Sequence, residues 1–487
     1  MTDHERGRVL FQQALQARAQ GDHASAETLL REALTHAPGR ESLRLNLSGA
    51  LIDQGKFDEG LVLCRELVQD FPANPLGWQR LSLCEAALGQ TAAALASIDR
   101  SLTLAPDDVG ALGHRLQLLM IRTHDNDAAL QTAQRALALS ADNAALHTGL
   151  GIVQTARRAF TAARDAHRQA LALTPHDADC QWNLALAELM LGEFADGWRH
   201  YEARWSNAQP AEMLYGDRRP RWDGTSALQG KRLVVWAEQG LGDTLQCSRY
   251  LAQLAAQDVA LIFQVPRQLI GLLRSLPGYQ SIVQEGDVLP PHDLQLPLMS
   301  LPAFLPGPIP APARLAPSST HRQRWAGRLG PRQRPRVGLM WQGNISNQPG
   351  LHRSLQVSQL APLLSLPLEF HCVGNAVSAE DRRWLQQHAP ALQIHADQLK
   401  DFSDTAALLE QLDLLITIDT SIAHLGPSLD VPSWVLLSWQ ADWRWAPEGD
   451  STPWYPQSRL FRQPQTRRWD EVVRTLADAL AAHFQTD

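Results

Sequence analysis

Cysteine is scarce in this 487-residue sequence, and its placement excludes two common uses of the residue. The five cysteines are scattered and contain no Cys-x-x-Cys pair: Cys64, Cys84, Cys180, Cys247 and Cys372. Neither a disulfide framework nor a zinc site is predicted from this pattern, which is typical of a reducing compartment. We therefore expect a cytoplasmic protein.

Long apolar runs and a positive net charge are also absent. No uninterrupted apolar stretch approaches the roughly 20 residues of a membrane helix, and the start, MTDHERGRVL, does not resemble a signal peptide. The formal net charge of −7 argues against a nucleic-acid partner. With 44% hydrophobic and 20% charged residues, the composition is that of a soluble globular chain of two or three domains.

Residues 1–205 repeat with a period of 34 residues. Small residues or prolines recur at three positions of the period: Gly21, Gly55 and Gly89; Pro38, Pro72 and Pro106; Ala26, Gly60, Ala94, Ala128 and Ala162. This period is typical of tetratricopeptide repeats, in which the glycine ends the first of two helices and the proline ends the unit. We expect about six units in a solenoid. Two roles remain open for this solenoid. Its concave surface binds an extended partner, or the solenoid is a scaffold that only orients the second half of the chain or forms a dimer.

After a polar connector at 206–230, short apolar runs alternate with helix-like segments. Seven runs are predicted as buried strands: 233–236, 260–265, 281–283, 337–341, 368–373, 414–418 and 434–437. This alternation predicts parallel sheets covered by helices on both faces, which bind ligands at the carboxyl ends of their strands. We expect a short first lobe at 231–300, a proline- and arginine-rich linker at 301–335, and a second lobe at 336–487 with a terminal helix.

Acidic residues are missing between Asp293 and Glu369, whereas arginine is frequent there. The arginines are Arg314, Arg322, Arg324, Arg328, Arg332, Arg334, Arg336 and Arg353. Two interpretations remain open. The segment is a solvated basic linker, or it forms a positive wall of the cleft for a diphosphate or an anionic acceptor.

Two motifs place polar side chains directly after predicted strands. In AEQGLGDTLQ, residues 237–246, Asp243 follows Gly240 and Gly242, where its carboxylate can cap a helix or accept a proton. The glycines allow a close approach of acceptor and backbone. Glu238 is a second candidate base on the same turn.

The second motif is DTSIAHL, residues 419–425, at the start of a predicted helix. Unpaired backbone N–H groups at a helix start favour an anion, and the hydroxyls of Thr420 and Ser421 add donors for phosphate oxygens. His424 lies one turn further on the same side. Without a ligand, Asp419 or Thr420 is an N-cap and His424 a packed histidine.

Together with ADWRW, TPWYP and RLFRQ near the C-terminus, these motifs resemble glycosyltransferases of the heptosyltransferase family (family nine), especially members with N-terminal tetratricopeptide repeats. The resemblance implies a two-lobed GT-B fold and an inverting, metal-independent transfer. A nucleotide-diphosphate sugar is the co-substrate, and no further cofactor is expected. The match implies that Asp243 is the general base and that Asp419, Thr420, Ser421 and His424 bind the donor phosphates.

The loop WQGNISNQPGLHRS, residues 341–354, matches the family only at Gly343, Asn344 and Arg353. We assign these three residues, with Gly240 and Gly242, to donor binding. The second half contains no Asp-x-Asp pair, which agrees with positive groups rather than a metal stabilising the leaving group. The short first lobe indicates that the repeats supply part of the acceptor site.

The sequence therefore predicts a glycosyltransferase whose acceptor is positioned by the repeats. The acceptor is a protein side chain, a saccharide or a lipid intermediate. The alternative is a non-catalytic adaptor, in which the repeat scaffold is attached to a degenerate transferase domain.

Overall fold

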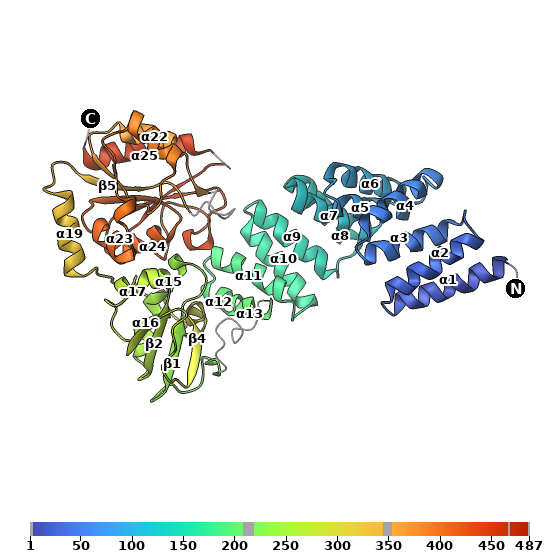
Figure 1. Ribbon diagram of the computed structural model, residues 1–487, viewed down its shortest axis with the longest axis horizontal. Helices are drawn as coiled ribbons and strands as arrows, with labels where there is room; N and C mark the ends of the chain where they lie inside the picture. The colour runs from blue at the N-terminus through green and yellow to red at the C-terminus, as the bar shows by residue number, and fades with distance from the viewer. Residues whose placement is uncertain (1–2, 208–218, 344–352, 466–467, 486–487) are drawn as a thin grey trace. The chain divides into compact units, whose positions relative to one another are not determined.

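The computed structural model describes residues 3–207, 219–343, 353–465 and 468–485 (Figure 1). The chain divides into two compact units, Met1–Asn183 and Leu184–Asp487. The first unit is helical, and the second contains both sheets together with the last helices of the repeat region. None of the described helices is long and apolar enough to cross a membrane.

Helical hairpins fill the repeat region, as the 34-residue period predicts. The helices are α1 (Asp3–Ala19), α2 (His23–His36), α3 (Glu41–Asp53), α4 (Phe57–Asp70), α5 (Pro75–Ala87), α6 (Thr91–Leu104), α7 (Val109–Leu118), α8 (Asn126–Leu139), α9 (Ala144–Ala156), α10 (Phe160–Leu173), α11 (Ala178–Met190), α12 (Phe194–Tyr201) and α13 (Arg204–Asn207). Gly21, Gly55 and Gly89 adopt φ of +79°, +73° and +76°, a left-handed conformation that ends α1, α3 and α5. The predicted all-helical solenoid is confirmed.

The 34-residue spacing breaks once, in the hairpin of α7 and α8. Helix α7 continues into a π-helix (Leu119–Thr123), whose wider turn accommodates one additional residue. The left-handed residue that follows, His124, lies 35 positions after Gly89 rather than 34. The later left-handed residues, Arg158 and Gly192, return to the 34-residue step.

This insertion corrects part of the predicted repeat register. The small-residue contacts expected at Ala128 and Ala162 are wrong by one position, because Ala129 and Ala163 are the fully buried residues, with 0% exposure. Ala162 itself is exposed. The same insertion explains the position of Pro175, the proline of a later repeat. Pro175 lies one residue further from Pro106 than two periods of 34 residues would place it.

The first lobe is a four-stranded parallel sheet in the order β3-β2-β1-β4. Its strands are β1 (Arg232–Trp236), β2 (Ala260–Val265), β3 (Ser281–Gln284) and β4 (Leu294–Pro297), and its helices are α15 (Leu241–Cys247), α16 (Leu251–Ala255) and α17 (Arg267–Leu273). Three strands lie where the apolar runs predict them. Strand β4 was not predicted, because it is short and lies in the proline-rich stretch.

The second lobe is a six-stranded parallel sheet in the order β10-β9-β8-β5-β6-β7. Its elements are β5 (Arg336–Met340), α21 (Ala361–Leu364), β6 (Glu369–Cys372), α22 (Ala379–His388), β7 (Gln393–Ile394), α23 (Phe402–Leu409), β8 (Leu414–Ile418), α24 (Ser421–Ser428), β9 (Ser433–Leu437), the short 3-10 helix η6 (Trp443–Trp445), β10 (Arg459–Arg462) and α25 (Trp469–Phe484). Helices α22 and α25 cover one face of this sheet, and α23 and α24 cover the other (Figure 1). The predicted parallel sheets are confirmed.

The expected linker at 301–335 contains two helices, α18 (Leu301–Phe304) and α19 (Ser319–Leu329). Helix α19 was not predicted. Its residues lie in a proline-free window between Pro317 and Pro331. The Ser318 hydroxyl caps its first turn by accepting from the His321 N–H, and the buried Trp325 anchors its inner face.

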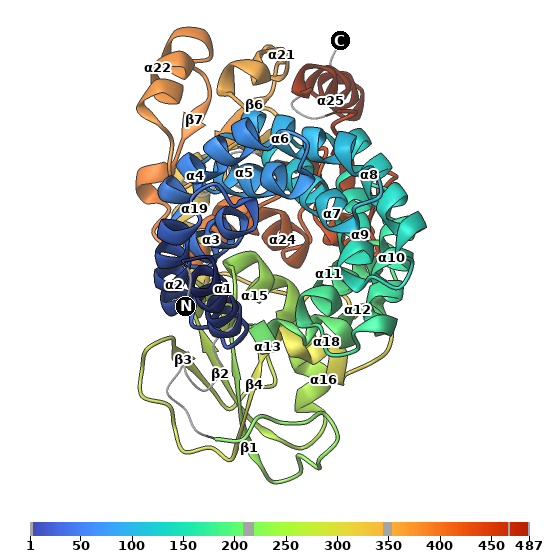
Figure 2. The ribbon, with the colours of Figure 1, turned by 90° about the vertical axis from the view of Figure 1, so that its right-hand side faces the viewer.

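The two lobes contact each other through helices that begin at the carboxyl ends of their strands. Helix α15 packs on α24, and α17 packs on α23; α15 and α24 are neighbours in Figure 1 and in Figure 2. A first-lobe glycine allows each contact. A Cβ atom on Gly242 would lie 3.3 Å from Ser421 Cα, and one on Gly271 would lie 2.5 Å from Ser403 Oγ. The predicted motifs of the two lobes therefore meet at the contact of α15 with α24.

Candidate functional site

Asp243 caps the helix that follows β1. It occupies the third position of α15, and its Oδ2 accepts a hydrogen bond of 2.8 Å from the Gly240 N–H. Gln239, on the same turn, has a φ of +62°, so the chain bends sharply between strand and helix. Gly240 thus contributes a backbone donor to Asp243. The capping interpretation of Asp243 is confirmed.

The other oxygen of Asp243 binds an arginine of the second lobe. The Arg444 Nη2 donates to Asp243 Oδ1 at 2.5 Å, its Nη1 donates to Asp442 Oδ1 at 2.7 Å, and its Nε donates to Gln246 Oε1 at 2.5 Å. The guanidinium also lies 4.1 Å from the ring centroid of Trp443. Burial opposes its charge, but the carboxylates of Asp442 and Asp243 raise the pKa of Arg444 above its ordinary value. A charged arginine therefore joins the predicted base to the other lobe.

The DTS sequence lies at the carboxyl end of β8, as predicted. The Thr420 hydroxyl is the N-cap of α24 and accepts from the Ile422 N–H at 3.3 Å. Asp419 is not the cap; its Oδ2 lies 3.5 Å from Arg353 Nη1. Burial raises the pKa of Asp419, the nearby Asp442 raises it further, and Arg353 opposes the shift. Asp419 is thus a buried carboxylate paired with Arg353.

His424 is held on three sides and is only 4% exposed. Its Nδ1 lies 2.8 Å from the Tyr455 hydroxyl, and its ring stacks on Trp445 at 5.6 Å. The Cδ2 and Nε2 edge faces Gly242. Burial lowers the pKa of His424 well below its ordinary value, and the charges of nearby arginines lower it further. His424 is therefore a packed, neutral imidazole at the contact between the lobes.

Glu238, the second candidate base, has both oxygens occupied by structural contacts. Arg204 donates to Oε1 at 2.9 Å and to Oε2 at 3.1 Å, and the Met299 N–H donates to Oε1 at 3.0 Å. The Glu238 side chain is 7% exposed. This buried ion pair attaches α13 to the first lobe, which gives Glu238 a structural role; its role as a second candidate base stays a prediction.

The last repeat helices, α12 and α13, contact both lobes. The Tyr201 hydroxyl lies 3.0 Å from Gln239 Nε2, on the turn that leads to Asp243. Trp198 packs edge-on against Trp443 and Trp454 of the second lobe, with centroids 5.2 and 6.2 Å away. Within the second unit, α12 and α13 therefore belong to the surroundings of the site.

The loop after β5 is described only at its ends. The Gly343 N–H donates to the Ser354 hydroxyl at 3.0 Å, and Arg353 pairs with Asp419. The Nε of Arg353 is buried without a hydrogen-bond partner among the described residues. Asn344 lies outside the described residues, so its predicted donor contact stays a prediction.

Most arginines of the acid-free segment form ion pairs with the second lobe. The pairs are Arg314–Asp430, Arg322–Glu410, Arg324–Asp404, Arg332–Asp413, Arg336–Glu369 and Arg353–Asp419. Their positive charge is matched locally by carboxylates. Of these, Arg353 is the arginine whose partner belongs to a predicted donor-binding motif.

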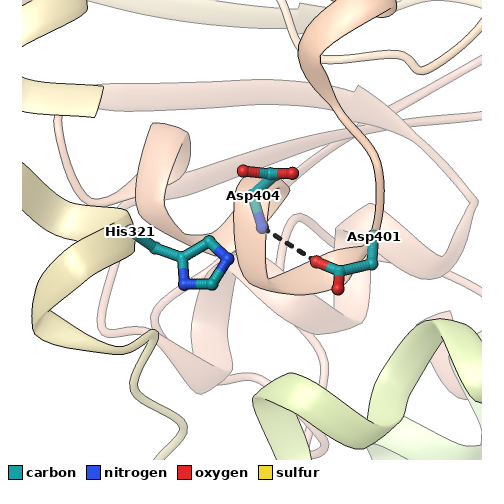
Figure 3. A group of neighbouring side chains, drawn as sticks. All are labelled: His321, Asp401 and Asp404. Atoms are coloured by element: carbon teal, nitrogen blue, oxygen red, sulfur yellow. Dashed lines mark hydrogen bonds between the residues drawn. The ribbon is translucent and has the colours of Figure 1, made fainter. Parts of the chain in front are cut away.

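One group in the described part of the chain has the composition and spacing of a metal site. The candidate ligand atoms of His321, Asp401 and Asp404 lie within 4.8 Å of one another (Figure 3). Asp404, however, already pairs with Arg324 and accepts from Trp325 Nε1 at 3.2 Å. One oxygen of Asp401 caps α23. Because a guanidinium occupies the carboxylate that a cation would need, we assign this group to the packing of α19 on α23.

Comparison with known proteins identifies the repeats. Two models of the tetratricopeptide repeat family match residues 17–79 and 50–109, so the N-terminal region carries these repeats. Protein FlbA of Caulobacter vibrioides is 25% identical over an alignment that covers 89% of this chain and 72% of FlbA.

Solved structures of repeat proteins resemble part of the chain. A tetratricopeptide repeat protein from Parabacteroides merdae has 21% identity and a TM-score of 0.37, and the match covers 43% of this chain and 83% of that one. A thermophilic repeat protein from Thermus thermophilus has 22% identity and a TM-score of 0.33, with 38% of this chain and 99% of that one covered.

Proposed function

We propose that the protein is a glycosyltransferase of the GT-B type that transfers a sugar from a nucleotide-diphosphate donor to an acceptor. One observation carries the proposal. The motifs around Asp243 and His424, recognised separately in the sequence, lie against each other where α15 meets α24. Both follow the carboxyl end of a parallel strand, where open parallel sheets bind ligands.

The start of α24 is the proposed site of the donor diphosphate. Its first N–H groups and the Ser421 hydroxyl are suited to phosphate oxygens. Arg353 supplies positive charge here, because its Nη1 lies 3.5 Å from Asp419 Oδ2 at the end of β8. Arg444 supplies more, because it binds Asp243, whose neighbour Gly242 packs on Ser421. Arginine matches phosphate geometry through parallel N–H groups. His424 contributes at most a neutral donor, because its pKa is well below its ordinary value.

In the proposed reaction, the oxygen of an acceptor hydroxyl attacks the anomeric carbon opposite the diphosphate. The new glycosidic C–O bond forms while the bond to the diphosphate oxygen breaks, and the diphosphate keeps that electron pair. The acceptor proton passes to the carboxylate of Asp243, a general-base contribution of about 10²–10⁴-fold. The arginines stabilise the charge that develops on the leaving group.

A non-catalytic adaptor is the second candidate, and one observation favours it. Both oxygens of Asp243 are engaged, one by the Gly240 N–H and the other by Arg444. A carboxylate held in this way also suits a purely structural link between the lobes. In that case the repeats bind a partner and the two-lobed part has no donor.

Nucleotide binding separates the two functions. Thermal unfolding should be followed with ADP, UDP, GDP and dTDP, because a ligand bound only by the folded state raises the melting temperature. A transferase predicts a concentration-dependent rise with at least one of the four. No rise with any of them, together with no hydrolysis of the corresponding sugar nucleotides, supports the adaptor.

A further inference from the structure

We propose that Asp243 and the donor diphosphate compete for Arg444, so that donor binding itself releases the base. This inference rests on the proposed function and extends it. In the absence of donor, Arg444 would be bound to Asp243. In the donor complex, the guanidinium would turn to the phosphate oxygens and leave Oδ1 of Asp243 free.

Every nitrogen of the Arg444 guanidinium donates to an acceptor. Nη2 contacts Asp243, Nη1 contacts Asp442, and Nε contacts Gln246. The residue is 8% exposed. Its two carboxylate partners differ in position. Asp442 lies two residues away in the same loop, whereas Asp243 and Gln246 both belong to α15 of the other lobe, so the bonds to these two residues must break if Arg444 moves with its own loop.

The anion that could replace Asp243 has its proposed site beside this ion pair. Gly242, the neighbour of Asp243, packs on Ser421 and His424 of α24. Trp445, the neighbour of Arg444, stacks on the His424 ring with centroids 5.6 Å apart. The charge of Arg444 lowers the pKa of His424 in addition to the larger effect of burial. A diphosphate at the start of α24 would therefore meet a guanidinium already within this cluster. It offers more negative charge than the single carboxylate of Asp243.

The exchange has a direct consequence for proton transfer. While Arg444 binds Oδ1, a proton arriving at that oxygen must displace a positive charge. Once Arg444 has moved, Oδ2 still accepts from the Gly240 N–H, which holds the carboxylate in place, and Oδ1 accepts the acceptor proton. The base is then available only when a donor is present.

Calorimetric titration of the full-length protein with the tightest of ADP, UDP, GDP and dTDP tests the competition. Asp243→Asn removes the carboxylate that competes with the diphosphate for Arg444. We therefore expect this variant to bind the nucleoside diphosphate more tightly than wild type, by about threefold to tenfold. Arg444→Gln should bind it at least about tenfold more weakly. Asp430→Asn is the matched control, because it removes an exposed carboxylate from the Arg314 pair. Its affinity should equal that of wild type.

A static link between the lobes makes the opposite prediction. Loss of the ion pair would then loosen the site, and Asp243→Asn would bind the diphosphate equally or more weakly, which overturns the exchange. Asp243→Ala provides a second variant without the carboxylate and must change the affinity in the same direction. If wild type binds none of the four diphosphates, the proposed function fails as well. If wild type binds one and either variant fails to bind it more tightly, only the exchange fails.

Discussion

Gly242 and His424 touch across the contact between the two lobes. A Cβ atom on Gly242 would lie 2.8 Å from His424 Cδ2 and 3.3 Å from the backbone at Ser421. Any side chain at position 242 therefore requires the His424 ring to shift or α15 to move away from α24. The contact places the turn that carries Asp243 against the first residues of α24, so the geometry of the proposed site depends on it.

Gly242→Ala should therefore separate the lobes slightly. Forcing a methyl group into a packed contact costs about 1–3 kcal/mol, and the unfolding free energy measured in urea should fall by that amount. Binding of the nucleoside diphosphate should weaken as well. Gly327→Ala in α19 is the control, because a Cβ atom there meets nothing within 4 Å. Equal stability of the two variants would show that the contact is looser than described.

His424→Ala should weaken nucleotide binding by about tenfold, the loss expected for one hydrogen bond to a charged phosphate. Because burial lowers the pKa of His424 well below its ordinary value, the imidazole is neutral throughout pH 6–8. The ratio of wild-type to variant affinity should therefore be constant over that range. Calorimetry at three pH values measures it, and a ratio that rises as the pH falls would indicate a protonated ligand group.

The second lobe should lose stability in mild acid because of two buried histidines. His371 and His395 stack with ring centroids 5.3 Å apart, and burial lowers the pKa of each to about 4. An unfolded histidine titrates near 6.5, so the unfolded state binds more protons below that pH. Stability should be constant above pH 6.5 and fall between pH 6.5 and 4. Urea unfolding at pH 7 and pH 5 tests this, and His395→Gln should reduce the difference.

Glu238→Gln should lower the free energy of unfolding and leave the rate of transfer unchanged. Arg204, whose side chain is 8% exposed, would lose one of its two carboxylate partners, at a cost of about 3 kcal/mol. Transfer per folded molecule should remain near that of wild type. Glu410→Gln, which breaks the more exposed Arg322 pair, should cost no more than about 1 kcal/mol. A loss of turnover in a fully folded Glu238→Gln protein would make this residue a candidate base again.

The sequence predicted the strands and helices of the fold more completely than the contacts between them. Apolar runs predicted the central strands because buried parallel strands are continuously hydrophobic. Strand β7 was missed because it has only two residues, β4 because it lies in the proline-rich stretch, and β10 because arginines stand at both its ends. Helix α19 was missed because prolines flank it. The displaced Pro175 indicates that one residue is inserted between the later repeats, but it does not show where, so the shift from Ala128 to Ala129 could not be predicted.

The candidate site was predicted only in part, for a similar reason. Asp243 and His424 were found from local patterns, because each follows a strand at a helix start. Arg444 lies in the ADWRW motif, but its bond to Asp243 joins positions far apart in the sequence, which no local pattern reveals. The structural role of Glu238 likewise depends on Arg204, from another part of the chain.

The most direct test of the proposed function is sugar transfer by Asp243→Asn. With a sugar nucleotide identified by the thermal screen and its acceptor, both saturating, turnover should fall by about 10²-fold or more, because the side chain keeps its shape and cap but cannot take the proton. The variant should still bind the nucleoside diphosphate and unfold cooperatively. Turnover equal to that of wild type would contradict the account and leave Asp243 as a helix cap and a link between the lobes.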